Sequence, residues 1–191
     1  MTGPRTVLLA AALALAGCAS SPPSTFYTLS AVASPAPAGA STYGVSVGPV
    51  NVPETVDRPQ LMLQVSANRV ALEEFHRWAE PLAGGIAQTV AANLRSLLGT
   101  ARVAAAPGFS GGKPVYRVSL DVVRFESRLG ESATLDVLWT VGRDDDIVRS
   151  GLSEVVQPAP GGYDALVAAH SQALARVSAD IAAAIRSLAG G

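Results

Sequence analysis

The sequence predicts an α+β domain in which two helices pack on one face of an antiparallel sheet. Several short stretches alternate apolar and polar residues, which is typical of strands with one buried and one solvated face. Two longer stretches, 81–98 and 163–188, repeat apolar residues at helical spacing. Because the order along the chain is strands, helix, strands, helix, both helices are expected to cover the same sheet.

Three strands are expected before the first helix. Residues 43–52 alternate valine with glycine and serine. Residues 60–65 carry an apolar side chain at every second position, which places these side chains on one face. Residues 69–75 are expected to pair back on them through a hairpin turn at 66–68.

The first helix has recognisable ends. Pro81 suits the first helical position, because its missing N–H has no partner there, and Glu80 lies at the positive end of the helix dipole. Gly99 is a favourable residue just past the C-terminus, because glycine adopts the left-handed backbone conformation. The apolar stripe expected to face the sheet consists of Leu82, Ile86, Val90, Leu94 and Leu97.

Four strands and a closing helix follow. A short strand is expected at 102–105 and longer ones at 115–125, 134–141 and 147–156, before the helix over 163–188. The second and third of these strands show the clearest alternation. Their predicted buried residues are Tyr116, Val118, Leu120 and Val122, then Leu135, Val137, Trp139 and Val141.

The N-terminus carries a targeting signal. Arg5 precedes an apolar run over 6–16, and Leu15-Ala16-Gly17-Cys18 resembles the lipobox of bacterial lipoproteins. The apolar run is shorter than the ~20 residues that cross a bilayer. We therefore expect residues 1–17 to be a lipoprotein signal peptide and Cys18, the only cysteine, to be acylated. An ordinary secretory signal with a coincidental cysteine is the alternative.

The mature chain is expected to have two parts. Residues 18–42 form a lipidated flexible tether with a short strand at 26–29, and residues 43–191 form the α+β body. In extended form the polar segment before this strand lifts the body only ~15–25 Å off the lipid. Ala19, rather than aspartate, follows the lipidated residue. By resemblance to the sorting rule of enteric bacteria, this favours the outer membrane.

Composition and spacing argue against several classes of function. The formal net charge is −1, without the basic clusters that nucleic acid or an anionic membrane surface require. His76 and His170 have no cysteine or second histidine at ligand spacing. Asp144-Asp145-Asp146 lacks the later glycine and glutamate of a calcium loop and is expected to be a solvated turn. We therefore expect no metal site and no cofactor.

Five blocks of sequence together resemble a known family. They are FYTL at 26–29, VGPV at 47–50, DRPQ at 57–60, FHRWAEPL at 75–82 and NLRSLLG at 93–99. In this order and spacing they resemble the ABC-type transport auxiliary lipoproteins, the PqiC-like family. The resemblance covers nearly all of the mature chain.

The resemblance implies a role in lipid transport between the inner and outer membranes. Such lipoproteins work with mammalian-cell-entry (MCE) domain proteins, which build hydrophobic conduits, and with an inner-membrane permease that acts with or without an ATPase. This chain would be the non-catalytic element on the periplasmic face of the outer membrane. It contains no Gly-x-x-x-x-Gly-Lys-[Ser/Thr] phosphate loop, so no ATPase activity of its own is expected.

Two alternatives from other classes are open at this point. One is an envelope lipoprotein that regulates a cell-wall (peptidoglycan) enzyme through a similar tethered domain, and the other is a hydrolase. A pull-down for an MCE partner separates the first alternative from the transport role. The free edges and the uncovered face of the predicted sheet also favour self-association. A ring of identical subunits is therefore a further hypothesis.

The junction between the third strand and the first helix holds three candidate interface residues, Arg77, Trp78 and Glu80. In one interpretation Trp78 fills the edge of the core and Glu80 starts the helix. In the other, Trp78 or Arg77 contacts a partner or a sister subunit, because tryptophan and arginine are enriched among the residues that anchor interfaces. Replacing Trp78 with alanine separates the two, because only the structural role predicts a large fall in melting temperature.

The loop Asp57-Arg58-Pro59-Gln60 supplies the other candidate interface residues, Asp57, Arg58 and Pro59. An ion pair from Asp57 to Arg58, or to a distant arginine, would give the loop a structural role. Contact of these side chains with a partner is the functional interpretation.

Overall fold

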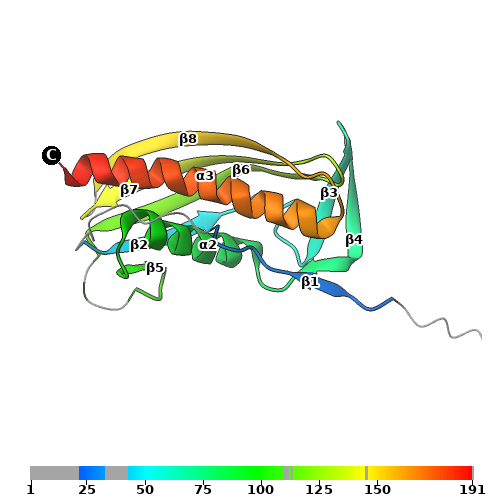
Figure 1. Cartoon of the computed structure of the whole chain (residues 1–191), viewed down its shortest axis with the longest axis horizontal. Helices are drawn as coiled ribbons and strands as arrows, with labels where there is room; N and C mark the ends of the chain where they lie inside the picture. The colour runs from blue at the N-terminus through cyan, green and yellow to red at the C-terminus, as the bar shows by residue number, and fades with distance from the viewer. Residues whose placement is uncertain (1–21, 33–42, 110–111, 113, 145, 191) are drawn as a thin grey trace, which may run out of the picture.

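The computed structural model describes residues 22–32, 43–109, 112, 114–144 and 146–190. The predicted signal peptide, Cys18 and most of the second half of the predicted tether lie outside the described residues. The described chain forms two sheets and two helices (Figure 1).

The larger sheet has five strands. They are β2 (Val45–Asn51), β5 (Val103–Ala105), β6 (Tyr116–Arg128), β7 (Ser132–Arg143) and β8 (Asp146–Pro158). Their order across the sheet is β5-β2-β6-β7-β8. β2 is parallel to both of its neighbours, and the remaining pairings are antiparallel.

Helices α2 (Leu82–Leu98) and α3 (Tyr163–Ala189) cover one face of this sheet (Figure 1). The side chains with no exposed surface between helices and sheet include Ile86, Val90, Leu94, Leu174, Val177 and Ile181. α2 ends at Gly99 with a φ of 63°, the predicted left-handed conformation, while Pro81 is the N-cap residue, one position before its predicted place. Neither helix of the described chain has the length and apolarity of a membrane span.

A smaller sheet of three strands lies at the end of the molecule opposite the C-terminus (Figure 1). Its strands are β1 (Thr25–Tyr27), β3 (Gln60–Ser66) and β4 (Arg69–Trp78), in the order β1-β4-β3. β3 and β4 form the predicted hairpin, and β1 pairs with β4 in parallel. A small apolar cluster joins this hairpin to the start of α3 and consists of Leu63, Ala133, Ala159, Leu166 and Ala169.

The predicted α+β class with two helices is confirmed, and the inward-facing residues predicted for β6 and β7 are buried. Two details of the sheet differ from the expectation. The β3–β4 hairpin belongs to a separate sheet, and β2 lies in parallel between β5 and β6. A parallel pair needs a long crossover connection, and the chain between β2 and β5 provides one that contains α2.

Candidate partner-binding site

A hollow of about 390 Å³ lies where β4 passes into α2. Its lining residues come from two segments and are Asp57, Arg58, Pro59, Trp78, Ala79, Glu80, Pro81 and Leu82. Five of the six candidate interface residues therefore meet in one place, although they lie in separate parts of the sequence. The sixth candidate, Arg77, does not line the hollow.

Backbone hydrogen bonds hold the two segments together. The N–H of Trp78 donates to the carbonyl oxygen of Pro59 (2.7 Å), and the N–H of Ala79 donates to that of Tyr27 (2.9 Å). Within the loop, the N–H of Asp57 donates to the carbonyl oxygen of Pro53 (3.1 Å). These bonds fix the backbone that carries the candidate side chains.

Trp78 forms a buried wall of the hollow. The residue is only 7% exposed, and its ring meets that of Phe125 of β6 edge to face, with centroids 6.0 Å apart and planes at 77°. This contact joins the smaller sheet to the larger one. The geometry supports the structural interpretation of Trp78, while its contact with a partner stays a prediction.

Charged side chains stand around the hollow. Asp57 and Arg58 are exposed, and an Arg58 Nη2 atom donates to the carbonyl oxygen of Glu54 (3.5 Å). Both residues are described, and they form no ion pair with each other, so the loop is not ordered by a bridge between them. Glu80 is half-buried and accepts a hydrogen bond from Gln88 (3.1 Å), and its charge is favoured at the N-terminal end of α2.

Arg77 lies on the other side of β4 from Trp78, because successive side chains of a strand point to opposite faces. Its Nε donates to the carbonyl oxygen of Glu74 (2.8 Å), and its guanidinium pairs with the Glu74 carboxylate at 3.6 Å. Side chains this exposed, 34% for Arg77 and 58% for Glu74, form an ion pair that contributes little to stability.

One protein-family model matches residues 27–182, from β1 to near the end of α3. That family is described as the ABC-type transport auxiliary lipoprotein component. The chain belongs to this family. The family resemblance predicted from the sequence blocks is therefore confirmed. A comparison with curated proteins gave no match.

Solved structures share the fold of this auxiliary lipoprotein. A crystal structure of a Xanthomonas campestris protein of the DUF330 family is 22% identical, covers 83% of this chain and 93% of its own, and has a TM-score of 0.69. A crystal structure of an uncharacterized protein is 22% identical, covers 86% and 99%, and has a TM-score of 0.70. A PelC dodecamer from Paraburkholderia phytofirmans is 16% identical over 76% and 91%, and its TM-score of 0.43 carries no argument.

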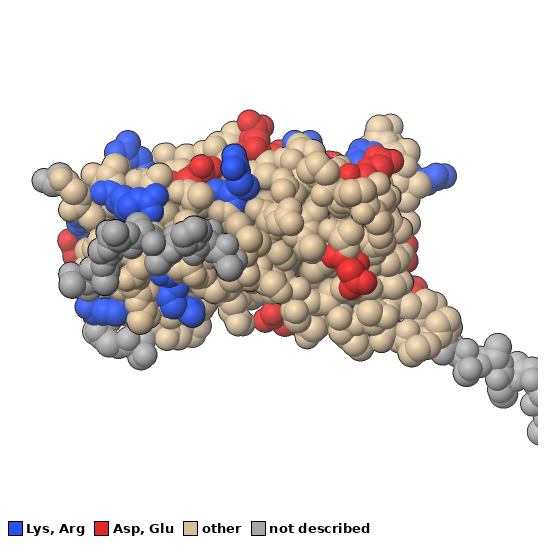
Figure 2. Space-filling model, in the orientation of Figure 1, with Lys and Arg blue, Asp and Glu red and all other residues tan. Residues whose placement is uncertain are grey.

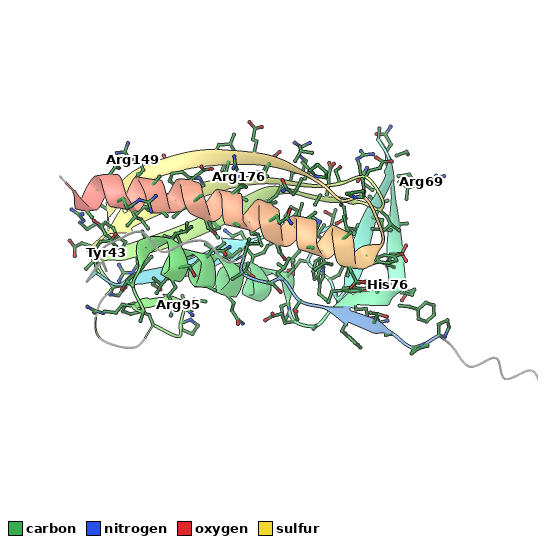
Figure 3. The ribbon with its side chains drawn as sticks, in the orientation of Figure 1. Tyr43, Arg69, His76, Arg95, Arg149 and Arg176 are labelled. Atoms are coloured by element: carbon green, nitrogen blue, oxygen red, sulfur yellow. The ribbon has the colours of Figure 1, made fainter. Side chains whose placement is uncertain are left out.

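An aromatic cluster, which the sequence analysis did not predict, holds β1 of the auxiliary lipoprotein in place. The hydroxyl of Tyr27 and Nδ1 of His76 are hydrogen-bonded at 2.9 Å, and the His76 ring stacks on Tyr163 with centroids 3.6 Å apart. Tyr163 donates to Glu73 (2.8 Å), and burial together with this bond raises the pKa of Tyr163 to about 12. Figure 3 shows His76 beside the N-terminal end of α3. No sequence spacing links these residues, because only the pairing of β1 with β4 brings them together.

His170 is fully buried in α3 of the auxiliary lipoprotein. Its Nε2 lies 2.8 Å from the hydroxyl of Ser127, and its ring stacks on Phe125 with centroids 4.0 Å apart. Burial lowers the pKa of His170 to about 3, so the ring is neutral at ordinary pH. In the described part of the chain, no three histidine, cysteine, aspartate or glutamate residues group as metal ligands. Asp145 of the predicted aspartate turn lies outside that part.

One short motif bears on the hydrolase alternative. Gly108-Phe109-Ser110-Gly111-Gly112 has the spacing Gly-x-Ser-x-Gly. In hydrolases of the α/β type the serine of this motif stands on a turn from a strand into a helix. Here the motif stands between two strands, β5 and β6, and two of its residues, Ser110 and Gly111, lie outside the described chain. The order of elements therefore gives the hydrolase alternative no support.

Proposed function

We propose that this lipoprotein is a non-catalytic auxiliary component of an MCE-type lipid transport system between the inner and outer membranes. It is anchored through an acylated Cys18 to the periplasmic face of the outer membrane. Its partners are an MCE-domain protein and the inner-membrane permease, with or without an ATPase. The family match over residues 27–182 is the observation that supports this function most strongly, because it spans both sheets and the hollow.

The hollow at the β4–α2 junction is the proposed docking site for the partner. It combines an apolar wall, formed by Trp78 and Leu82, with exposed charges of opposite sign at Asp57 and Arg58. An apolar centre with a polar rim is typical of protein interfaces. Because backbone hydrogen bonds already fix both segments, binding here orders little additional chain.

The docking site is tested by affinity capture from solubilised membranes. The wild-type chain should capture an MCE-domain protein and a permease, and Arg58→Glu should lower capture by about tenfold or more, since it reverses a charge at the rim of the hollow. Arg69→Glu is the matched control, because Arg69 is an exposed arginine at the start of β4 that does not line the hollow. Equal capture by both variants would contradict the site. Capture of a peptidoglycan synthase instead would favour the regulatory alternative.

The anchor is tested separately. Mass spectrometry of the wild-type protein should find acyl chains on the N-terminal cysteine, and Cys18→Ser should release the protein from membranes. In a density gradient the wild type is expected with outer-membrane markers. An unmodified, freely soluble wild type would contradict the anchor. Migration with the inner membrane would correct the location alone.

A ring of identical subunits is the proposed assembly. β8 is a 13-residue strand at the edge of the larger sheet, and it exposes Leu152 and Val156. A long unpaired edge is a template for pairing with another chain. Light scattering on the unlipidated body should give a mass of several subunits. A strict monomer at high concentration would argue against the ring.

A further inference from the structure

Two strands of the smaller sheet expose large apolar side chains. Phe26 of β1 is 62% exposed, and Leu72 and Phe75 of β4 are each 39% exposed. The neighbouring Tyr27 and His76 point to the other side, where they are hydrogen-bonded to each other. We refer to Phe26, Leu72 and Phe75 as the β1–β4 face.

The chain before β1 limits where this face can lie. Thr25, the first residue of β1, follows Cys18 by seven residues. An extended chain spans at most ~3.3–3.6 Å per residue, so β1 begins within about 25 Å of Cys18. Thr25 pairs in turn with His76 of β4. An acyl anchor on Cys18 therefore holds the whole face close to the membrane.

We propose that the β1–β4 face rests on the lipid surface that holds the anchor, with Phe26 and Phe75 inserted between the headgroups. This inference depends on the acylation of Cys18 proposed above. Phenylalanine and leucine on one face are typical of contacts with the membrane interface. A short tether gives the second contact an effective concentration in the millimolar range. A contact too weak to hold the free body is therefore populated in the anchored protein.

The charges beside the face indicate an apolar contact rather than an electrostatic one. Arg77 is the register partner of Phe26, and its guanidinium pairs with Glu74 at 3.6 Å. The two charges offset each other, so the attraction to anionic lipid is small. The contact should therefore change little with ionic strength, in contrast to that of a basic surface.

The contact also sets the orientation of the body. α3 has 27 residues and is about 40 Å long. Its C-terminus lies at the opposite end of the molecule from β1 (Figure 1), and Lys and Arg side chains gather over that end (Figure 2). Arg143 and Arg186 belong to it, since they donate to the carbonyl oxygens of Leu188 and Leu97 near the ends of the two helices. With the β1–β4 face on the membrane, this basic end points away from it.

The test uses the full-length acylated protein in vesicles of phosphatidylethanolamine and phosphatidylglycerol. Phe26→Trp and Phe75→Trp each place a fluorescent probe on the β1–β4 face. Lipids brominated on their acyl chains should quench the added emission at least twofold, at both low and high salt. Ile147→Trp is the matched control, because Ile147 is 70% exposed near the β7–β8 turn at the basic end. The native Trp78 and Trp139, each 7% exposed, supply the background from the wild type.

Each outcome decides the proposal once mass spectrometry has reported on acylation. Quenching at positions 26 and 75 but not at 147 supports it. No quenching in acylated protein overturns the membrane contact and leaves the anchor standing. A blue shift without quenching shows that a second copy or a partner protein covers the face, and equal quenching at all three positions shows that the body has no fixed orientation. Either result overturns the proposal, and recovery of unacylated protein overturns it together with the anchor.

Discussion

The two sheets of this lipoprotein are stabilised in different ways. The five-stranded sheet lies against both helices, and its inward side chains, such as Val118, Leu135 and Val141, have no exposed surface. The three-stranded sheet depends on individual contacts, such as the stack of His76 on Tyr163, and leaves Phe26 exposed. Because buried apolar area is the main source of stability, the larger sheet carries most of it. The smaller sheet and its junction with α2 are the part that can present side chains to partners and to lipid.

The comparison breaks most severely at Trp78, where the two sheets meet. Trp78→Ala should lower the free energy of unfolding by about 3–5 kcal/mol, because it removes a buried ring that packs on Phe125. Denaturant unfolding measures this loss, and Trp78→Phe, which keeps an aromatic ring, should lose less. An alanine variant with unchanged stability but no partner binding would show instead that Trp78 acts mainly at an interface.

The larger sheet should weaken in acid through His170. The pKa of His170 is lowered to about 3 in the folded protein, whereas an unfolded histidine titrates near ~6.5. The unfolded chain therefore binds a proton that the folded chain does not. The stability that is present above about pH 6.5 is lost as the pH falls towards 3, by up to about 1.4 kcal/mol per pH unit. Denaturant unfolding at a series of pH values measures this slope.

His170→Gln is the matched variant for the acid prediction. Glutamine can still hydrogen-bond to Ser127, but it does not titrate, so the variant should show a flatter dependence of stability on pH. Parallel slopes for the variant and the wild type would mean that other groups cause the acid sensitivity.

A smaller and more local effect is expected at Tyr163. Tyr163→Phe keeps the ring that stacks on His76 and removes the hydrogen bond to Glu73, which should cost about 0.5–1.5 kcal/mol. Hydrogen exchange should quicken in β1 and β4 while β6 and β7 stay protected. Uniform loss of protection in all four strands would show that the two sheets unfold as one unit.

The smallest change in stability is expected at Arg58. Its side chain is exposed and donates only to a backbone carbonyl oxygen at 3.5 Å, so Arg58→Glu should alter the free energy of unfolding by less than about 0.5 kcal/mol. Thermal unfolding measures this, beside the loss of partner capture predicted above. A large fall in melting temperature would mean that Arg58 orders its loop and would remove it from the docking site.

Local patterns were sufficient to predict the elements. The helix expected over 81–98 runs over Leu82–Leu98, and the one expected over 163–188 runs over Tyr163–Ala189. Helical and strand periodicity are carried by residues close in sequence, so one chain is enough to read them. The same holds for the alternation of β6 and β7 and for the left-handed Gly99.

Strand partners could not be predicted in the same way. Thr25 pairs with His76, and Val45 lies between Val103 and Tyr116. These pairings depend on contacts between distant residues, and strands of similar alternation allow several orders. The smaller sheet and the parallel position of β2 were missed for this reason.

The candidate site was predicted as separate residues and not as a site. The hydrogen bond from the N–H of Trp78 to the carbonyl oxygen of Pro59 brings the two segments together, and backbone groups of this kind leave no mark in the sequence. Arg77 was grouped with Trp78 by adjacency, although neighbours in a strand point to opposite faces. The strand periodicity of 69–78 was the signal that could have separated them.

Site-specific photocrosslinking in living cells tests most directly the claim that this lipoprotein acts by binding a transport partner at the hollow. A photoreactive amino acid replaces Pro59, which lines the hollow, and Ile147 serves as the control position at the opposite end. The account predicts a crosslink from position 59 to an MCE-domain protein and none to that protein from position 147. Crosslinks to it from position 147 alone, or a crosslink from position 59 to a peptidoglycan synthase, would contradict the account.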